Sequence, residues 1–277
     1  MGTFFADISE FQVPVDDSYP YQILSIRSND GTYEDHRFAQ NYTWMRAALD
    51  SGKLTCGIVY CYWRTDIAAT FQTMQAQIDA NGGLHPKVIL MVDLESGGNP
   101  DMDETTAVDG MIDLMAGWTG DYKRVVLYAN RGDFYTMWAS YSTRLPQIGG
   151  TIGAGYGSNP QLPGQIAHQY TDGQGDYGQG LPYMCAPFGA CDMNVADNQT
   201  AEQFAAACGV GGDDMTPEQA ALLQQLAANV ELILQQLAGA SNFNGWPEGG
   251  GRTLYDLAAA TAAKVGVPNT SDTKAAS

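Results

Sequence analysis

The chain has 277 residues, of which 44% are hydrophobic and 16% are charged, so it is too long for a disulfide-stabilised mini-protein and too apolar for a disordered chain. Its formal net charge is −18 at pH 7. A surface this acidic repels phosphate groups, which argues against nucleic acid and against an anionic membrane as partners. The sequence contains no apolar run long enough to span a bilayer.

The N-terminal segment Met1–Asp7 has no basic region and no long apolar stretch, so we expect no secretory signal peptide. The chain has no Cys-x-x-Cys motif and only three histidines, so we expect no metal site and no cofactor. Cys185 and Cys191 bracket a turn-like segment, and they form either a loop-closing disulfide or two reduced thiols. The five cysteines are Cys56, Cys61, Cys185, Cys191 and Cys208.

Short apolar runs alternate with longer helical patterns along the first 208 residues. The runs are mostly continuous rather than alternating, which is typical of parallel strands buried on both faces. This alternation predicts an α/β fold. The expected elements are strands at 4–6, 23–26, 57–60, 88–92, 125–128, 152–156 and 166–170, and helices at 36–51, 66–82 and 103–118.

The composition changes at 209–215, a Gly- and Asp-rich segment typical of a linker. Thr216-Pro217 then favours a helix start, and we expect a helix over 216–238. Because its apolar stripe spans only about two heptads, this helix either docks on the main domain or mediates self-association. Over 239–277 we expect a short helical segment and a tail. The stripe consists of Leu223, Leu226, Val230, Ile233 and Leu237.

Two carboxylates follow the most apolar expected strand. Val88-Ile-Leu-Met-Val leads directly to Asp93 and Glu95, whose side chains at i and i+2 project from the same face. In a parallel barrel, the carboxyl ends of the strands surround the active site. Neighbouring carboxylates repel, so one has a raised pKa and can serve as an acid, as glycoside hydrolysis requires. The alternative is a polar strand end with ordinary loop hydrogen bonds.

Two more carboxylates have comparable positions. Asp7 follows the first apolar run, and Asp192 follows a turn near the end of the first 208 residues. For either residue alone, a purely structural role is the alternative.

Aromatic residues are frequent in the segments expected near these acids. Aromatic faces suit the apolar faces of sugar rings, and phenol hydroxyls suit their polar groups. For any single aromatic residue, a place in the core is the alternative. The candidates for substrate binding are Tyr60, Tyr62, Trp63, Tyr128, Tyr156 and Tyr170.

Several motifs occur in a defined order. Asp7-Ile-Ser-Glu-Phe-Gln12 opens the chain, Asp93-Leu-Glu95 lies near its centre, and Cys191-Asp192-Met-Asn194 comes late. Ser28–Asn41 and Gln169-Tyr170 lie between them. In these residues and this order, the first 208 residues resemble the glycoside hydrolase family 25 lysozymes, the Chalaropsis-type muramidases of phage lysins. The segment after Gly245 is also similar to the C-terminal parts of actinobacteriophage lysins.

The resemblance implies an irregular TIM-like (β/α) barrel over 1–208, followed by a small helical C-terminal module. It implies cleavage of the β-1,4 bond between N-acetylmuramic acid and N-acetylglucosamine, with Glu95 as the general acid. Asp93 would either stabilise positive charge on the sugar or orient a substrate acetamido group. Asp7 and Asp192 would lie on the cleft floor, and Gln169 would bind substrate.

Three positions depart from the family's pattern. His168 stands where the family usually has Trp, Cys61 where it usually has His, and Asp30 where it often has Glu. The departures bear on the sugar subsites and therefore on substrate preference, whereas the four principal acids all match.

The leading hypothesis is a phage peptidoglycan hydrolase, made in the host cytoplasm and acting on the cell wall after holin release or as part of the virion. The alternative is a phage tail protein whose barrel binds wall glycan or acts as a tail-associated lysozyme. Self-association through 216–238, or contacts with other phage proteins, would suit that alternative. Retention of all four acids favours the enzyme.

Overall fold

The structure is a computed structural model that describes residues 2–211, 217–238 and 252–271. The chain divides into two compact units, Met1–Asp213 and Asp214–Ser277. The elements of the first unit are β1 (Phe4–Ile8), β2 (Ile23–Asp30), β3 (Tyr33–Glu34), α1 (Phe38–Asp50), β4 (Cys56–Tyr62), α2 (Ile67–Ala80), β5 (Val88–Asp93), α3 (Thr105–Thr119), η1 (Tyr122–Arg124), β6 (Val125–Asn130), α4 (Arg131–Asp133), η2 (Phe134–Ala139), β7 (Gly150–Ala154), β8 (Gln165–Thr171), β9 (Met184–Cys185), β10 (Gly189–Ala190), β11 (Asp192–Ala196) and α5 (Ala201–Ala207).

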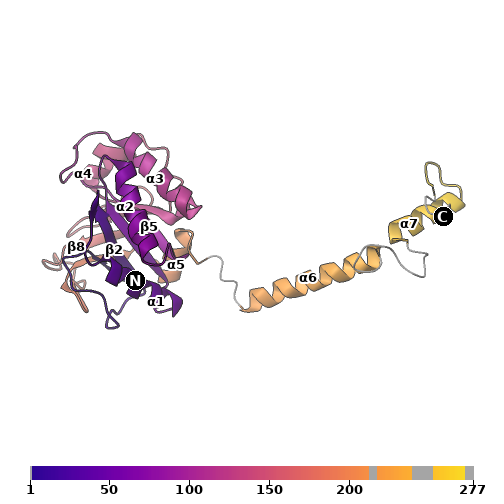
Figure 1. The fold of residues 1–277 in the computed structure, drawn as a ribbon, viewed down its shortest axis with the longest axis horizontal. Helices are drawn as coiled ribbons and strands as arrows, with labels where there is room; N and C mark the ends of the chain where they lie inside the picture. The colour runs from indigo at the N-terminus through magenta and orange to yellow at the C-terminus, as the bar shows by residue number, and fades with distance from the viewer. Residues whose placement is uncertain (1, 212–216, 239–251, 272–277) are drawn as a thin grey trace. The chain divides into compact units, whose positions relative to one another are not determined.

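Within residues 2–211, eight strands close into a barrel in the order β1-β11-β8-β7-β6-β5-β4-β2, and the pairing of β1 with β2 completes the circle (Figure 1). All neighbours pair in parallel except β11, which is antiparallel to both β1 and β8. The short β3 pairs antiparallel with β2 outside the circle. The predicted irregular TIM-like barrel is confirmed, and the antiparallel β11, which the sequence did not indicate as a strand, makes it irregular.

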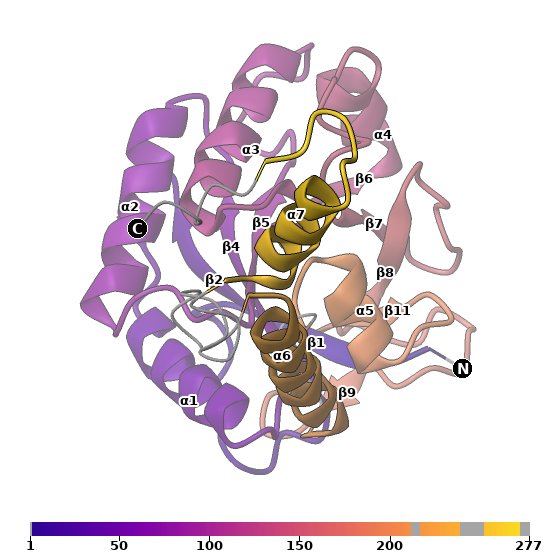
Figure 2. The same ribbon diagram turned by 90° about the vertical axis from the view of Figure 1, so that its right-hand side faces the viewer.

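The central strands are buried on both faces. Leu90 and Val92 of β5 point outward into an apolar layer beneath the helices, whereas Ile89 and Met91 point into the barrel. This double burial explains why the run is continuously apolar. Helices α1, α2 and α3 cover the outside of β2, β4, β5 and β6, and β8 and β11 lie on the other side of the barrel (Figure 2).

Helix α5 closes the amino-terminal end of the barrel. Phe204 is fully buried in the inner apolar cluster, with its ring centroid 5.8 Å from that of Phe5. Thr200 and Gln203 start the helix with reciprocal side-chain to backbone hydrogen bonds. Val210 is also buried in this cluster, so the packed unit extends beyond the boundary expected at residue 208. The opposite, carboxyl-terminal end is left for the site.

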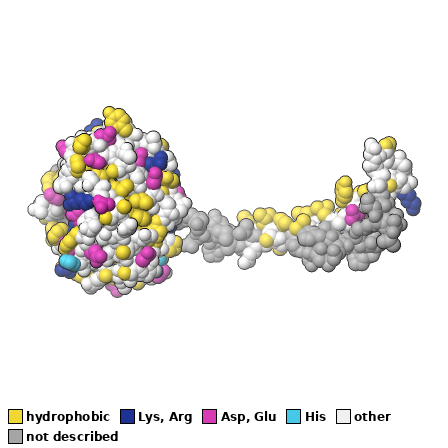
Figure 3. Space-filling model, turned by 45° about the horizontal axis from the view of Figure 1, so that its top comes forward, with side chains coloured by type: hydrophobic (Ala, Val, Ile, Leu, Met, Phe, Trp, Pro, Cys, Tyr) yellow, Lys and Arg dark blue, Asp and Glu magenta, His cyan; other side chains and the backbone are white. Residues whose placement is uncertain are grey.

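The second unit contains α6 (Pro217–Ala238) and α7 (Leu254–Lys264), close to the two helices expected there. Hydrophobic side chains lie along α6 (Figure 3). We use the name α6 stripe for Leu226, Val230, Ile233 and Leu237, which are 46–57% exposed.

Parts of the predicted C-terminal organisation lie outside the described residues. These are 212–215 of the linker, Thr216, 239–251, the end of the tail and the side chain of Leu223. Among the helices that the structure describes, none is long and apolar enough to cross a membrane.

Candidate active site

The strand ends bring the four predicted acids to one cavity at the barrel mouth. Asp7 lies near the end of β1 and faces Asp192, at the start of β11, across an antiparallel pair. Asp93 ends β5, and Glu95 follows two residues later. The cavity has a volume of about 40 Å³ and is lined by Asp7, Tyr60, Met91, Asp93, Glu95, Tyr128, Gln169 and Asp192.

A second, wider cavity lies beside the first. Its volume is about 280 Å³, and Glu95 and Tyr128 line both cavities. The wider cavity is otherwise lined by Asn130, Ala154, Gly155 and Tyr156. The carboxyl group of Glu95 therefore stands between a narrow acidic space and a larger opening.

Burial and mutual repulsion raise the pKa values of these acids. The pKa of Asp93 is raised well above its usual range, first by burial and then by the negative charges of Glu95 and Asp7. The pKa of Glu95 is also raised, by burial and then by the charge of Asp133. Among the described residues, Asp93 Oδ1 has no hydrogen-bond partner. The pair therefore keeps a proton to higher pH than ordinary carboxyl groups do.

The other two acids are shifted in the same direction. Burial raises the pKa of Asp7 to about 6, and the Arg27 guanidinium opposes part of that rise. Burial and the charge of Asp7 raise the pKa of Asp192 to about 7. At neutral pH, the four carboxyl groups at the barrel mouth therefore carry fewer than four negative charges.

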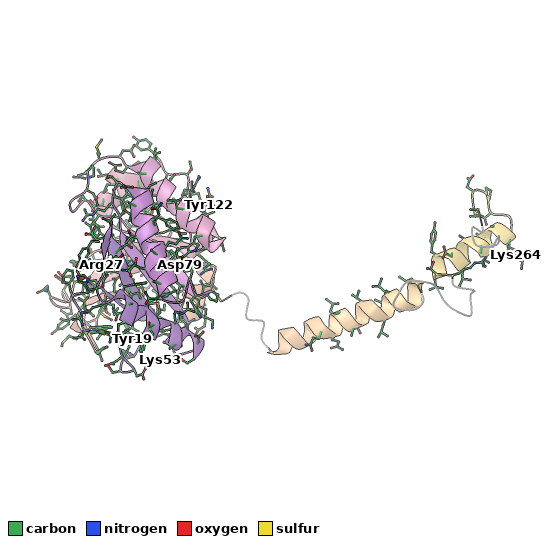
Figure 4. All side chains as sticks on the ribbon, in the orientation of Figure 1. Tyr19, Arg27, Lys53, Asp79, Tyr122 and Lys264 are labelled. Atoms are coloured by element: carbon green, nitrogen blue, oxygen red, sulfur yellow. The ribbon has the colours of Figure 1, made fainter. Side chains whose placement is uncertain are left out.

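Arg27 is a charged residue of the site that sequence analysis missed. It lies on β2 (Figure 4), and its guanidinium group lies 3.2 Å from Asp35 Oδ2 and 3.6 Å from Glu10 Oε1. Its positive charge lowers the pKa values of both Asp7 and Asp93, against the effect of burial. The signal was the alternation Ile23-Leu-Ser25-Ile-Arg27, in which the polar residues of an apolar strand share one face.

Tyrosines and one glutamine form the wall next to Glu95. Tyr128 donates its hydroxyl hydrogen to Gln169 Oε1 at 2.7 Å, and Tyr156 donates to the same oxygen at 3.1 Å. Tyr62 donates to the carbonyl oxygen of Gly97, in the loop after Glu95, at 2.8 Å. The structure therefore brings Tyr60, Tyr62, Tyr128, Tyr156 and Gln169 together around the acids.

Trp63 and Tyr170 are not at the site, which corrects their assignment to substrate binding. Both are fully buried in the outer apolar layer. Successive side chains of a strand point to opposite faces, so Trp63 and Tyr170 point away from the cavity that Tyr62 and Gln169 approach. The Tyr170 hydroxyl instead donates to the carbonyl oxygen of Pro182 at 2.5 Å.

All five cysteines lie in described residues and are buried free thiols, which agrees with the reduced-thiol alternative for Cys185 and Cys191. The three departures from the family pattern are outside the residues that line the two cavities. Cys61 is buried in the outer layer, and His168 Nδ1 lies 2.8 Å from Asp197 Oδ1. Within 2–211, 217–238 and 252–271, no group of three or more His, Cys, Asp or Glu could hold a metal ion.

The barrel is similar to solved structures of lytic proteins. It matches the catalytic domain of endolysin ply40 from bacteriophage P40 of Listeria monocytogenes with a TM-score of 0.54 and 20% identity, over 76% of this chain and 98% of that one. It matches GHIP, a glycosyl hydrolase 25 of Streptococcus pneumoniae, with a TM-score of 0.52 and 14% identity, over 74% and 92% of the two chains. The fold is therefore that of the glycoside hydrolase 25 lysozymes.

Among curated proteins, the chain is 52% identical over 251 residues to the uncharacterized protein Rv3766 of Mycobacterium tuberculosis (strain ATCC 25618 / H37Rv). The match covers 89% of this chain and 88% of that protein. The chain belongs to the same family as Rv3766. No protein-family model matches it.

Proposed function

We propose that the protein is a peptidoglycan hydrolase that cleaves the β-1,4 bond between N-acetylmuramic acid and N-acetylglucosamine. The observation that carries this proposal is the position of Glu95, half-buried beside Asp93 and between an acidic cavity and an open one. Its raised pKa suits an acid that must be protonated before the reaction. Two proteins with similar structures, an endolysin and a glycosyl hydrolase 25, support the same chemistry.

In this mechanism Glu95 gives its proton to the glycosidic oxygen as the bond to the anomeric carbon breaks. A water molecule then adds to that carbon and returns a proton to Glu95. Asp93 assists from the buried side, either by stabilising positive charge on the sugar or by orienting its acetamido group. Its Oδ1 is buried and has no hydrogen-bond partner among the described residues. Tyr128, Tyr156 and Gln169 then bind the sugar next to Glu95.

The experiment is an analysis of the products from purified peptidoglycan. Borohydride reduction after digestion, followed by mass spectrometry, should reveal new reducing ends on muramic acid. The Glu95→Gln variant, incubated in parallel, controls for contaminating hydrolases. New amino termini without new reducing sugar ends would contradict the proposal, because they would show peptide-bond cleavage instead.

The second candidate is a phage tail component that binds wall glycan, either without cleavage or as a tail-associated lysozyme. The exposed α6 stripe favours it, since virion parts commonly assemble as oligomers. Sedimentation of the protein with whole cell-wall sacculi separates the candidates. Pure binding would be unchanged in Glu95→Gln and would release no reducing ends.

We place its action at the wall, after holin release or from the virion. We further propose an actinobacteriophage origin, for which the similarity to a Mycobacterium tuberculosis protein supports only the choice of host group.

A further inference from the structure

The loop after Glu95 is held on its β4 side by Asn99. The Asn99 amide Nδ2 donates to the carbonyl oxygen of Glu95 itself at 2.8 Å and to that of Trp63 at 2.9 Å. One side chain therefore ties the backbone of Glu95 to the residue that follows β4. Because the bond reaches the Glu95 carbonyl, we expect loss of this amide to change the direction of the Glu95 side chain.

Arg64 packs against the same loop. Its guanidinium lies over the Tyr62 ring at 4.6 Å and donates from Nη1 to the Gly97 carbonyl at 3.1 Å. At the two glycines of the loop, a larger residue would displace the ends of the Tyr62 and Arg64 side chains. A Cβ on Gly97 would lie 2.7 Å from the Tyr62 hydroxyl, and one on Gly98, where φ is +74°, would lie 2.8 Å from Arg64 Nη1.

Asp133 holds the loop from the β6 side. Its Oδ2 accepts hydrogen bonds from the backbone N–H of Ser96 at 3.0 Å and from Asn130 Nδ2 at 2.7 Å. Asn130 Oδ1 in turn accepts from the Asp133 backbone N–H at 3.0 Å. Asp133 is only 7% exposed, so this carboxylate is a fixed part of the mouth of the barrel.

We propose that Asn99 and Asp133 are positioning residues for Glu95, which clamp its loop from the two neighbouring strands and aim its carboxyl group at the glycosidic oxygen. The inference rests on the proposed role of Glu95 as the general acid. Asp133 has a second effect. Its negative charge raises the pKa of Glu95, in addition to the larger rise that burial causes.

Other charged and titratable groups also face Glu95 or its neighbours, and they stay unchanged in the tests below. They are Asp93 on β5, Asp7 on β1, Asp192 on β11, Arg27 on β2, Tyr62 on β4, Tyr128 on β6, and Tyr156 and Arg64 in the adjoining loops.

The first test is Asp133→Asn, which keeps an acceptor for Ser96 and Asn130 and removes the charge. Carbon-13 NMR of the Glu95 carboxyl should show a lower pKa than in the wild type. The alkaline limb of the kcat/KM profile on peptidoglycan should move to lower pH, since Glu95 then loses its proton earlier. Asp113→Asn is the control: it makes the same charge change on α3, at a residue paired with Arg144, and should move neither curve.

The second test compares two variants, Asn99→Ala and Asn99→Asp. The aspartate side chain has the shape of asparagine, but its carboxylate cannot donate a hydrogen bond. Both should lower kcat by about 10- to 100-fold with little change in KM, because a misdirected acid slows the chemical step rather than binding. Asn81→Ala should leave the rates unchanged; Asn81 makes a similar bond, at 2.7 Å to the Gln77 carbonyl, near the end of α2.

The outcomes distinguish a failure of the positioning role from a failure of the proposed function. Wild-type kcat in Asn99→Ala and Asn99→Asp would overturn the positioning role, and an unchanged Glu95 pKa in Asp133→Asn would overturn the charge effect of Asp133. A wild-type protein that releases no reducing ends would instead overturn the proposed function. The NMR titration would then still decide whether the charge of Asp133 acts on Glu95. If Asn99→Ala fails to fold, Asn99→Asp, which keeps the shape of the side chain, decides the role of Asn99.

Discussion

The two ends of the barrel interior use the same strands for opposite purposes. At the amino-terminal end, Phe5 and Phe204 belong to an apolar cluster closed by α5. At the carboxyl-terminal end, the strands instead deliver four carboxyl groups, with Arg27 as a nearby cation. Burying carboxyl groups opposes folding, whereas burying aromatic rings favours it. The comparison shows a chain whose closed end stabilises the fold and whose open end gathers the four carboxyl groups at a cost in stability.

The largest expected effect is at the open end. Glu95→Gln should lower the rate of glycan cleavage by about 10²- to 10⁴-fold, because the amide has the shape of the acid but cannot donate its proton. Zymography and a soluble-substrate assay measure the loss. The melting temperature and circular dichroism spectrum should stay close to those of the wild type. Retention of more than about a tenth of the wild-type rate would remove Glu95 from the role of general acid.

The matching change at the closed end is Phe204→Ala. Removing this fully buried ring should lower the free energy of unfolding by about 3–5 kcal/mol, measured by urea denaturation. At a temperature where the variant is still folded, kcat should equal that of the wild type, since α5 lies at the other end of the barrel. Glu202→Ala, an exposed position in α5, should cost less than about 1 kcal/mol. A large fall in kcat for Phe204→Ala would show that the two ends are not separable.

A third change tests how much a buried carboxyl group lowers the free energy of unfolding. Because the pKa of Asp192 is raised from 3.8 to about 7, this residue contributes stability at low pH that is lost as the pH rises from about 4 through about 7. Asp192→Asn removes that loss and should be more stable than the wild type at pH 8, by up to about 4 kcal/mol. Denaturation at pH 5 and pH 8 measures the difference. Equal pH dependence in both proteins would mean that Asp192 is not strained by burial.

The smallest expected effect on catalysis comes from the second unit. Leu226→Asp with Ile233→Asp should abolish self-association while leaving cleavage of soluble glycan unchanged, because the acids lie in the first unit. Each buried Leu or Ile would contribute about 1.5–3 kcal/mol to a helix–helix contact. Leu232→Asp, exposed on α6 outside the stripe, is the matched control. Sedimentation of the unmodified protein as a strict monomer at high micromolar concentration would contradict self-association.

Local patterns predicted the parts of the site that depend on a single segment. The continuous apolar run of β5 and the i, i+2 spacing after it were enough to place Asp93 and Glu95 together on one face. The ordered motifs added Asp7 and Asp192 through the resemblance to the lysozymes. Trp63 and Tyr170 were misplaced because an aromatic residue in a strand fits either face, and only the strand register decides which one it occupies.

The sequence by itself determined the alternation of strands and helices, the acid pair after β5 and the apolar stripe of α6, because each depends on the spacing of near neighbours. Only the tertiary structure decided the antiparallel entry of β11, the closure by α5, and the approach of Arg27, Asn99 and Asp133 to the acids. These features join residues far apart in the chain, since Asn99, although near Glu95 in sequence, also binds the distant Trp63 carbonyl. These contacts form only when the barrel closes. Closure also excludes water from the interior, and this burial shifts the pKa of each carboxyl group.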